Sequence, residues 1–184
     1  MIDVELVGNA LCLDFTNTVN SRPVARRDWL ATPEGAVTWS SAAGHPIERQ
    51  AGLPAALPDA RDLRETVFRV FRPLTRGDDP PRVDLDILTA AYADGLAHAR
   101  FERDDGRFRF AWPAPRTVGT LLREVTASAV DLLTRGPLER IHACPSCQWL
   151  FLDTSKNGRR RWCSMTACGS RDKARRYYAA RTSS

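Results

Sequence analysis

The stretch CPSC-QWLFLDTSKNGRRRW-CSMTAC, residues 144–168, decides the fold of the C-terminal part of this chain. It contains four of the five cysteines of a 184-residue sequence, while Cys12 stands alone in an apolar stretch near the start. Zinc takes about four ligands in a tetrahedron, and a C-x2-C pair supplies two thiolates from one tight turn. The spacing therefore predicts one zinc site with four protein ligands, Cys144, Cys147, Cys163 and Cys168.

Two other interpretations of the cysteines are a redox C-x2-C motif and free structural thiols. A redox motif does not need the second pair, so the metal is favoured. Four thiolates leave no coordination position open to water, and we therefore expect a structural Zn²⁺ without a catalytic role. The segment has few apolar residues for a core of its own, so zinc binding is expected to supply folding free energy directly.

Charge is distributed unevenly along the chain. The sequence has a net charge of +5, but the segment from Glu139 to Ser184 has ten Lys or Arg against three acids, which leaves residues 1–138 slightly acidic. A basic segment beside a mildly acidic body is typical of a nucleic-acid-binding appendage. The alternative is a solvated basic surface, which charge alone does not exclude.

The basic residues of this segment fall into two groups, a loop before Cys163 and a predicted helix after Cys168. Phosphates are contacted by such cations, and base edges are read by Arg or amide side chains. Asp172 can pair with a neighbouring Arg at helical spacing and so partly neutralise the helix. The residues predicted to bind nucleic acid are Lys156, Arg159, Arg160, Arg161, Arg171, Lys173, Arg175 and Arg176.

The first 136 residues alternate between helical periodicity and turn signals. Asn9 and Thr32 are placed as helix caps, and Asp105-Gly106 is a strong hairpin signal. The predicted elements are a strand at 4–7, helices at 10–19, 32–44, 58–74, 84–97 and 115–134, a loop at 41–58 and a hairpin at 101–112.

Arg135-Gly136-Pro137 ends the last of these helices and marks a boundary. We therefore expect two domains, residues 1–136 and 137–184. The fold class is mainly α: a helical N-terminal domain with one β-hairpin, followed by a small treble-clef-like four-cysteine zinc module. In that module, two hairpin arms flank Cys144 and Cys147, and a helix starts at Gly169-Ser170.

Asp14 and Asn17 are three residues apart and share one face of the predicted helix. They are candidates for lining a small-ligand pocket or for capping a neighbouring element. The structural role is favoured, because buried Asp and Asn side chains often bind backbone groups.

Two segments resemble known families. The segment Cys168-Gly169-Ser170-Arg171, with the two cysteine pairs and the Lys173, Ala174, Arg175 and Tyr178 that follow, resembles the CGNR zinc finger, although Ser170 stands where that family has Asn. Residues 8–19, GNALCLDFTNTV, are similar to the start of the ABATE domain, which commonly precedes this finger. The resemblance implies a stress-induced transcription regulator with a helical N-terminal domain and a DNA-binding finger.

The expected function is therefore a transcriptional regulator that binds DNA through its basic finger, while the helical domain senses a small-molecule effector or forms a homodimer. The alternative is a protein-protein interaction module in which zinc is purely structural. No catalytic motif is present: His45, His98 and His142 lack catalytic spacing, and there is no Gly-rich phosphate loop. Without a long apolar run or a signal-peptide pattern, a cytoplasmic protein with no membrane partner is expected.

Overall fold

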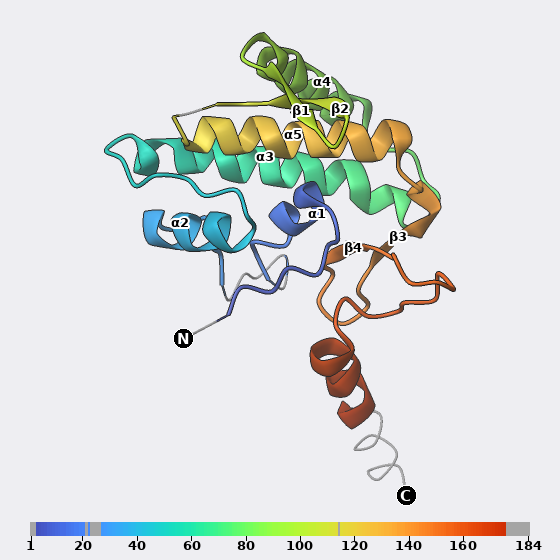
Figure 1. Ribbon diagram of the computed structural model, residues 1–184. Helices are drawn as coiled ribbons and strands as arrows, with labels where there is room; N and C mark the ends of the chain where they lie inside the picture. Colours follow the sequence, from blue (N-terminus) through green and yellow to red (C-terminus); the bar gives the residue numbers. More distant parts are fainter. Residues whose placement is uncertain (1–2, 21, 23–26, 114, 176–184) are drawn as a thin grey trace, which may run out of the picture.

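The computed structural model describes residues 3–20, 22, 27–113 and 115–175, and it shows a mainly helical chain with two small antiparallel hairpins (Figure 1). The predicted fold class is confirmed. No described helix is long and apolar enough to cross a membrane. The elements are α1 (Leu11–Thr16), α2 (Pro33–Ala42), α3 (Leu53–Leu74), α4 (Arg82–Ala97), β1 (Arg100–Asp104), β2 (Arg107–Ala111), α5 (Val118–Arg135), β3 (Ile141–Ala143) and β4 (Leu150–Leu152).

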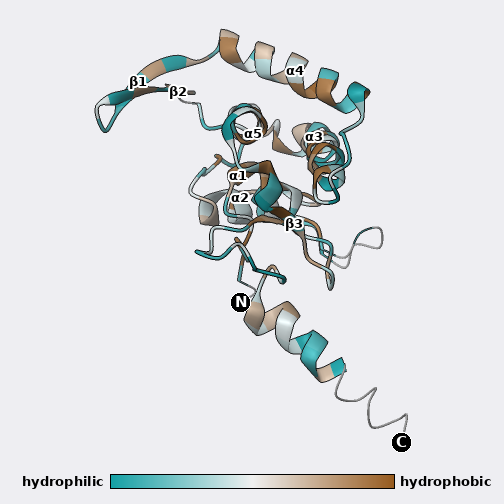
Figure 2. Cartoon of the chain, turned by 90° about the vertical axis from the view of Figure 1, so that its right-hand side faces the viewer, coloured by the Kyte–Doolittle hydropathy of each residue, from teal (hydrophilic) through white to brown (hydrophobic). Residues whose placement is uncertain are grey.

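The main core forms around α3 and α5, with α1 against both helices on one side and α4 on the other (Figure 2). Val67 and Phe71 of α3 and Val125 of α5 are completely buried there. Phe15 of α1 packs edge-on against Trp39 of α2, with ring centroids 5.7 Å apart. Burying each such side chain stabilises the fold by about 1.5–3 kcal/mol, so these apolar stripes determine how the helices pack.

The start of α2 agrees with the prediction, because the expected side chain caps it. Thr32 accepts a hydrogen bond from the Gly35 N–H at 3.1 Å, and α2 begins at Pro33 as expected. The predicted loop at 41–58 is wrong in its second half, because α3 begins at Leu53. Leu53 and Leu57 are buried in the core, and the first turn tolerates Pro54, so packing extends the helix back past Pro58.

The N-terminal segment differs most from the sequence-based prediction. Residues 4–7 form no strand, and α1 covers only part of the predicted helix at 10–19. Asn9 does not cap it: its backbone is left-handed, with φ at +58°, and its side-chain amide donates to the Leu152 carbonyl at 2.8 Å. The Asn9 side chain therefore binds a residue of the C-terminal module instead of capping α1.

The β1–β2 hairpin is confirmed, with Asp105 and Gly106 both at positive φ as the tight turn requires. Its strands are exposed apart from Ala111, and Phe101 stacks on Phe110 at the surface with ring centroids 4.9 Å apart.

The C-terminal module is joined closely to the helical domain. Ile141 of β3 and Leu150 of β4 belong to the main core, and β4 contacts α1. After β4, a loop leads to a helical segment that starts with a π-helical turn at Met165–Gly169 and continues to residue 175. The predicted start at Gly169-Ser170 is therefore too late, because the Ser164 hydroxyl already accepts from the Ala167 N–H at 3.2 Å. This segment projects away from the body of the molecule (Figure 1).

Candidate metal centre and the surfaces around it

The four cysteines predicted as ligands come together in one cluster. Each offers a sulfur, and all four sulfurs lie within 4.8 Å of one another. The Sγ atoms of Cys147 and Cys163 are 3.5 Å apart, as are those of Cys163 and Cys168. Zn–S bonds of about 2.3 Å in a tetrahedron place sulfurs about 3.8 Å apart. The donor set and its dimensions fit a zinc ion.

Local structure positions each of these cysteines. Cys144 and Cys147 lie in the turn between β3 and β4, which is closed by hydrogen bonds from the Gln148 N–H to the Cys144 carbonyl and from the Cys144 N–H to the Trp149 carbonyl. Gln148 has φ at +66°, which the sharp turn requires. Cys163 precedes the π-helical turn, and Cys168 lies within it. The knuckle and the start of a helix thus supply two sulfurs each.

The charges of the cluster call for a cation. Hydrogen bonds from Cys147 and Cys163 lower the pKa of Cys144, and the hydrogen bond to Cys144 in turn raises the pKa of Cys147 to about 12. The thiolate form of Cys144 is therefore stabilised, while that of Cys147 is disfavoured. Four thiolates this close together need a divalent cation between them. Arg171 adds a partner, since its Nη2 donates to the Cys168 sulfur at 3.1 Å.

Cys12 has no part in this cluster. It is completely buried in the helical core, where burial raises the pKa of its thiol to about 12. A buried neutral thiol of this kind is chemically inert. The expectation that Cys12 stands apart from the metal site agrees with this environment.

The loop from Asp153 to Arg160 is fixed by one buried carboxylate, which sequence reasoning about functional residues missed. The side chain of Asp153 accepts from the N–H groups of Ser155 and Arg160, both at 2.8 Å. The hydrogen bond with Ser155 is the largest cause that lowers the pKa of Asp153, to about 2. An Asp followed by Thr, Ser and Asn is the signal that could have indicated this turn.

Arg160 points into the molecule. Its guanidinium donates to the carbonyls of Trp162, Val7 and Cys163, and it lies over the Phe151 ring, 4.5 Å from the centroid. It therefore links the N-terminal segment to the module around the cysteines. Among the described residues predicted to bind nucleic acid, Arg160 is the one that is only partly exposed.

The other predicted cations lie at the surface. Lys156, Arg159 and Arg161 are exposed on the loop, and Arg171 and Lys173 are exposed on the projecting helical segment. On that segment, Arg175 pairs with the buried Asp172, with Nη2 and Oδ1 2.8 Å apart, as the helical spacing predicted. Arg176, Tyr177 and Tyr178 lie outside the described residues.

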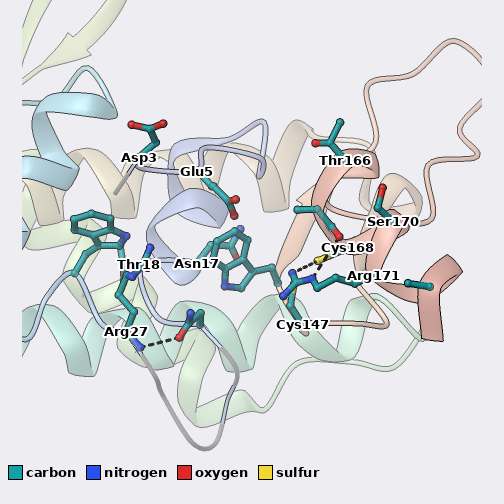
Figure 3. Close-up of a pocket in the computed structure, with 15 residues that line it drawn as sticks. Asp3, Glu5, Asn17, Thr18, Arg27, Cys147, Thr166, Cys168, Ser170 and Arg171 are labelled. Carbon is teal, nitrogen blue, oxygen red and sulfur yellow. Dashed lines mark hydrogen bonds between the residues drawn. The ribbon is translucent and has the colours of Figure 1, made fainter. Parts of the chain in front are cut away.

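A pocket of about 630 Å³ lies between the N-terminal segment and the module (Figure 3). Trp29 and Trp149 provide aromatic surface, Arg27 and Arg171 provide positive charge, and the carboxylates of Asp3 and Glu5 provide negative charge. Asn17 lines this pocket, whereas Asp14 does not. Two of the clustered cysteines also contribute to its wall, namely Cys147 and Cys168. A molecule bound here would contact both parts of the chain.

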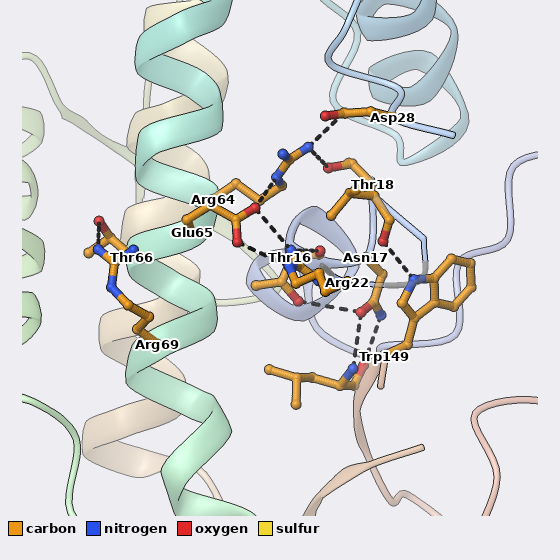
Figure 4. Close-up of polar contacts among 12 residues, drawn as sticks. Thr16, Asn17, Thr18, Arg22, Asp28, Arg64, Glu65, Thr66, Arg69 and Trp149 are labelled. Atoms are coloured by element: carbon orange, nitrogen blue, oxygen red, sulfur yellow. Dashed lines mark hydrogen bonds and ion pairs between the residues drawn. The ribbon is translucent and has the colours of Figure 1, made fainter. Parts of the chain in front are cut away.

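Asn17 joins the two parts of the chain through both atoms of its amide (Figure 4). Its Nδ2 donates to the Leu150 carbonyl at 2.8 Å, and its Oδ1 accepts from the Leu150 N–H at 3.0 Å. Beside it, the Trp149 indole N–H donates to the Val19 carbonyl at 2.8 Å. Asn17 therefore pairs with β4 much as a neighbouring strand would.

Asp14 holds the start of the chain. Its Oδ1 accepts from the Gly8 N–H at 2.7 Å, and burial raises the pKa of its carboxyl to about 6. A Cβ at Gly8 would lie 2.7 Å from the Asp14 backbone nitrogen, so only glycine allows this approach. The Gly8 carbonyl then accepts from the Leu152 N–H at 2.8 Å, which extends the contact with β4. Asp14 and Asn17 thus both bind backbone groups.

Comparison with known proteins yields two family matches. A family model named ABATE, described as "Putative stress-induced transcription regulator", matches residues 9–136. A second model, the CGNR zinc finger, matches residues 140–181. Both resemblances inferred from the residues are confirmed, in the expected order. No curated protein matches the chain.

Replacing Asn17 with Ala should destabilise the joint between the two parts of the chain. The change leaves the buried N–H and C=O of Leu150 without partners, and each unpaired group costs about 1–3 kcal/mol. Urea unfolding followed by circular dichroism should show a decrease of about 2–5 kcal/mol in the free energy of unfolding. The matched control is the exposed Asn157→Ala, expected within about 0.5 kcal/mol of wild type. Equal stabilities of the two variants would contradict the role given to Asn17.

Metal analysis of the purified protein tests the cysteine cluster. We expect about one zinc ion per chain by mass spectrometry of the metal content, since four thiolates complete one tetrahedron. The double variant Cys144→Ser/Cys163→Ser should release the metal on dialysis against a weak chelator, because a hydroxyl is a poor zinc ligand. Cys12→Ser should retain it. Equal metal content in both variants would contradict the assignment of Cys144 and Cys163 as zinc ligands.

Proposed function

Because the chain belongs to the ABATE family and carries a CGNR zinc finger, we propose that it is a transcriptional regulator that binds DNA through the finger. The observation that carries the proposal is the set of exposed cations on the two segments adjoining the cysteine cluster. Lys156 and Arg159 lie on the loop, and Lys173 lies on the projecting helical segment, all three without an ion pair among the described residues.

We propose a structural role for zinc in this surface. The loop and the projecting segment are held by few apolar contacts of their own: the local cluster consists of Phe151 and Trp162 with three of the cysteines. Cys163 and Cys168 fix the start of the helical segment, so the metal would hold the segment against the hairpin. Zinc binding would then contribute directly to the folding of the DNA-binding surface.

The projecting segment suits a nucleic acid groove. It extends from the body in both views, and its hydropathy changes from apolar near the cysteines to hydrophilic farther out (Figure 2). A helix of this kind can approach duplex DNA without interference from the helical domain. Because one finger makes few base contacts, we propose that two copies bind an operator together.

A protein partner is the second candidate function. An acidic protein surface would also complement Lys156, Arg159 and Lys173, and zinc would then serve only to fold the module. DNA is preferred over a protein partner because the chain belongs to a family described as transcription regulators. An enzymatic role has no support from the matches, since neither family is an enzyme family.

We further propose that the pocket between the N-terminal segment and the module binds an effector. Two indole rings favour a planar aromatic molecule, and the lining offers both arginines and carboxylates, so we propose a ligand with an acidic group for Arg27 and Arg171 and a hydrogen-bond donor for Asp3 or Glu5. Such a ligand would contact Arg171, which also donates to the Cys168 sulfur. The affinity for the ligand would then depend on the position of the projecting segment. Such a dependence is what couples ligand binding to DNA binding.

Neutralising the exposed cations should weaken DNA binding. In fluorescence-anisotropy titrations of duplex DNA at several salt concentrations, we expect Lys156→Gln/Arg159→Gln/Lys173→Gln to bind roughly ten- to a hundredfold more weakly than wild type. The slope of log K against log salt should fall by about 0.9 for each phosphate that the variant no longer neutralises. The variant retains Arg160, so the internal contacts of the loop stay intact.

The matched control removes three positive charges from the helical domain, as Arg49→Gln/Arg82→Gln/Arg135→Gln, and should bind nearly as wild type. These three arginines form exposed ion pairs with acids of the helical domain. Protein treated with a strong chelator should no longer bind if zinc holds the surface together. Failure of the zinc-loaded wild type to bind DNA at low salt would refute the proposal and favour the protein partner.

The effector proposal can be tested with 1-anilinonaphthalene-8-sulfonate, a fluorescent aromatic anion. We expect Arg27→Gln to bind this probe roughly tenfold more weakly than wild type, because Gln cannot form a charge-assisted hydrogen bond to the sulfonate. Arg49→Gln serves as the control with the same charge change outside the pocket. The probe should also alter the affinity for DNA, because coupling between two sites is reciprocal. Equal probe binding by the two variants would rule out this pocket as its site.

A further inference from the structure

A second cleft, of about 390 Å³, lies between the C-terminal end of α3 and the β3–β4 turn. Arg72 and Arg76 of the helical domain line one part, and Arg160 and Arg161 of the finger line another. None of its described lining residues is an acid. The cleft therefore brings cations of both parts of the chain to one place, although Arg72 and Arg76 lie more than sixty residues before the finger in the sequence.

Arg72, in the last turn of α3, and Arg76, in the turn that follows, differ from the arginines earlier in this helix. Arg64 pairs with Asp28 at 2.6 Å, and Arg69 pairs with Asp84 at 2.7 Å. Arg72 instead donates to neutral oxygens: the Thr75 hydroxyl and the Gln148 side-chain carbonyl, both at 2.9 Å. Its charge thus has no carboxylate partner among the described residues.

Arg76 has fewer side-chain contacts than Arg72. In the described part of the chain its side chain has no hydrogen-bond or ion-pair partner, and the residue is exposed. Asp78 and Asp79 follow closely in sequence, but they neither line the cleft nor form an ion pair with its arginines. Burial and the nearby charge of Arg76 lower the pKa of Arg72. Two uncompensated guanidinium groups this close together favour an anion between them.

The cysteine cluster does not account for these arginines. A zinc ion with four thiolates carries a net charge of −2, which nearby cations could offset. The arginine that donates to a cluster sulfur is however Arg171, on the other segment, while both hydrogen bonds of Arg72 go elsewhere. Neutralising the metal centre is therefore not the role that their contacts indicate.

We infer that this cleft binds a phosphate of the DNA backbone, so that the ABATE domain contacts DNA beside the finger. The inference rests on the proposed function and extends it to Arg72 and Arg76. A guanidinium offers paired donors that match phosphate oxygens. Gln148, in the turn of the finger, accepts a hydrogen bond from the Arg72 guanidinium and so orients it. Arg161, exposed on the same loop as Lys156 and Arg159, also lines the cleft.

A contact of this kind fixes the register of the complex. Phosphate contacts position a protein on the duplex, whereas base contacts specify the sequence. With one anchor on α3 and another on the finger, the projecting helical segment would meet the groove in one orientation. The hydrogen bonds between Asn17 and Leu150 join the two parts of the chain, which would help to hold the two anchors at a fixed spacing.

The test compares DNA binding by Arg72→Gln/Arg76→Gln with that of Arg82→Gln/Arg135→Gln, which removes the same charge from exposed ion pairs. We expect the first variant to bind duplex DNA roughly tenfold more weakly, with a salt slope smaller by about 0.9 per phosphate. The control should bind nearly as wild type. Arg76→Gln alone, which removes no internal hydrogen bond, should show a smaller change in the same direction, and zinc content should stay that of wild type.

Each outcome separates the two proposals. If wild type binds DNA but the Arg72/Arg76 variant behaves like the control, the cleft inference fails and the finger proposal stands. If wild type does not bind DNA at all, both fail. Inorganic pyrophosphate provides the remaining arm: if it raises the melting temperature of wild type but not of the variant, while DNA binding is equal in both, the cleft binds a free phosphate and the DNA assignment is overturned.

Discussion

The two hydrogen bonds between the Asn17 amide and the backbone of Leu150 are the constraint on which the arrangement of this protein depends. β4 is a short edge strand, and its buried N–H and C=O need partners. Asn17 supplies both from the end of α1, and Gly8 and Asn9 extend the contact to Leu152. The finger is therefore not a module on a linker: it continues the core of the helical domain.

The arginines named above fall into two classes, according to whether the side chain points into the fold or out to solvent. Arg160 and Arg64 point inward and satisfy carbonyl or carboxylate oxygens where the chain segments meet. Arg159 and Arg161 on the loop and Arg76 just after α3 are exposed, with no carboxylate partner among the described residues. An inward arginine stabilises the fold, and its removal would leave buried acceptors unpaired. An outward arginine costs the fold little, so its charge is available to a ligand.

The two pockets are both lined by residues from both parts of the chain. The larger pocket lies where the N-terminal segment meets Cys147 and Cys168, and the basic cleft lies where α3 meets the β3–β4 turn. Two cysteines of the cluster line the larger pocket, and Cys144 lines the basic cleft. A rigid metal centre would transmit a small displacement at one pocket to the other, because packed elements shift as units. If the pocket binds an effector and the cleft binds DNA, as we propose, the two ligands would influence each other through the finger.

The sequence by itself determined the features that depend on local chemistry. The four cysteines, the Thr32 cap and the Asp105-Gly106 turn each carry their physical reason within a few residues, and the structure has them as predicted. Tertiary structure decided the rest, because the deciding partner was distant. Asn9 and Asn17 were assigned from their helix neighbours, but each binds β4, more than 130 residues away. Arg72 offered no local signal at all, and only the packing of α3 against the finger placed it beside Gln148, since long-range contacts are specified by the whole core and not by any one segment.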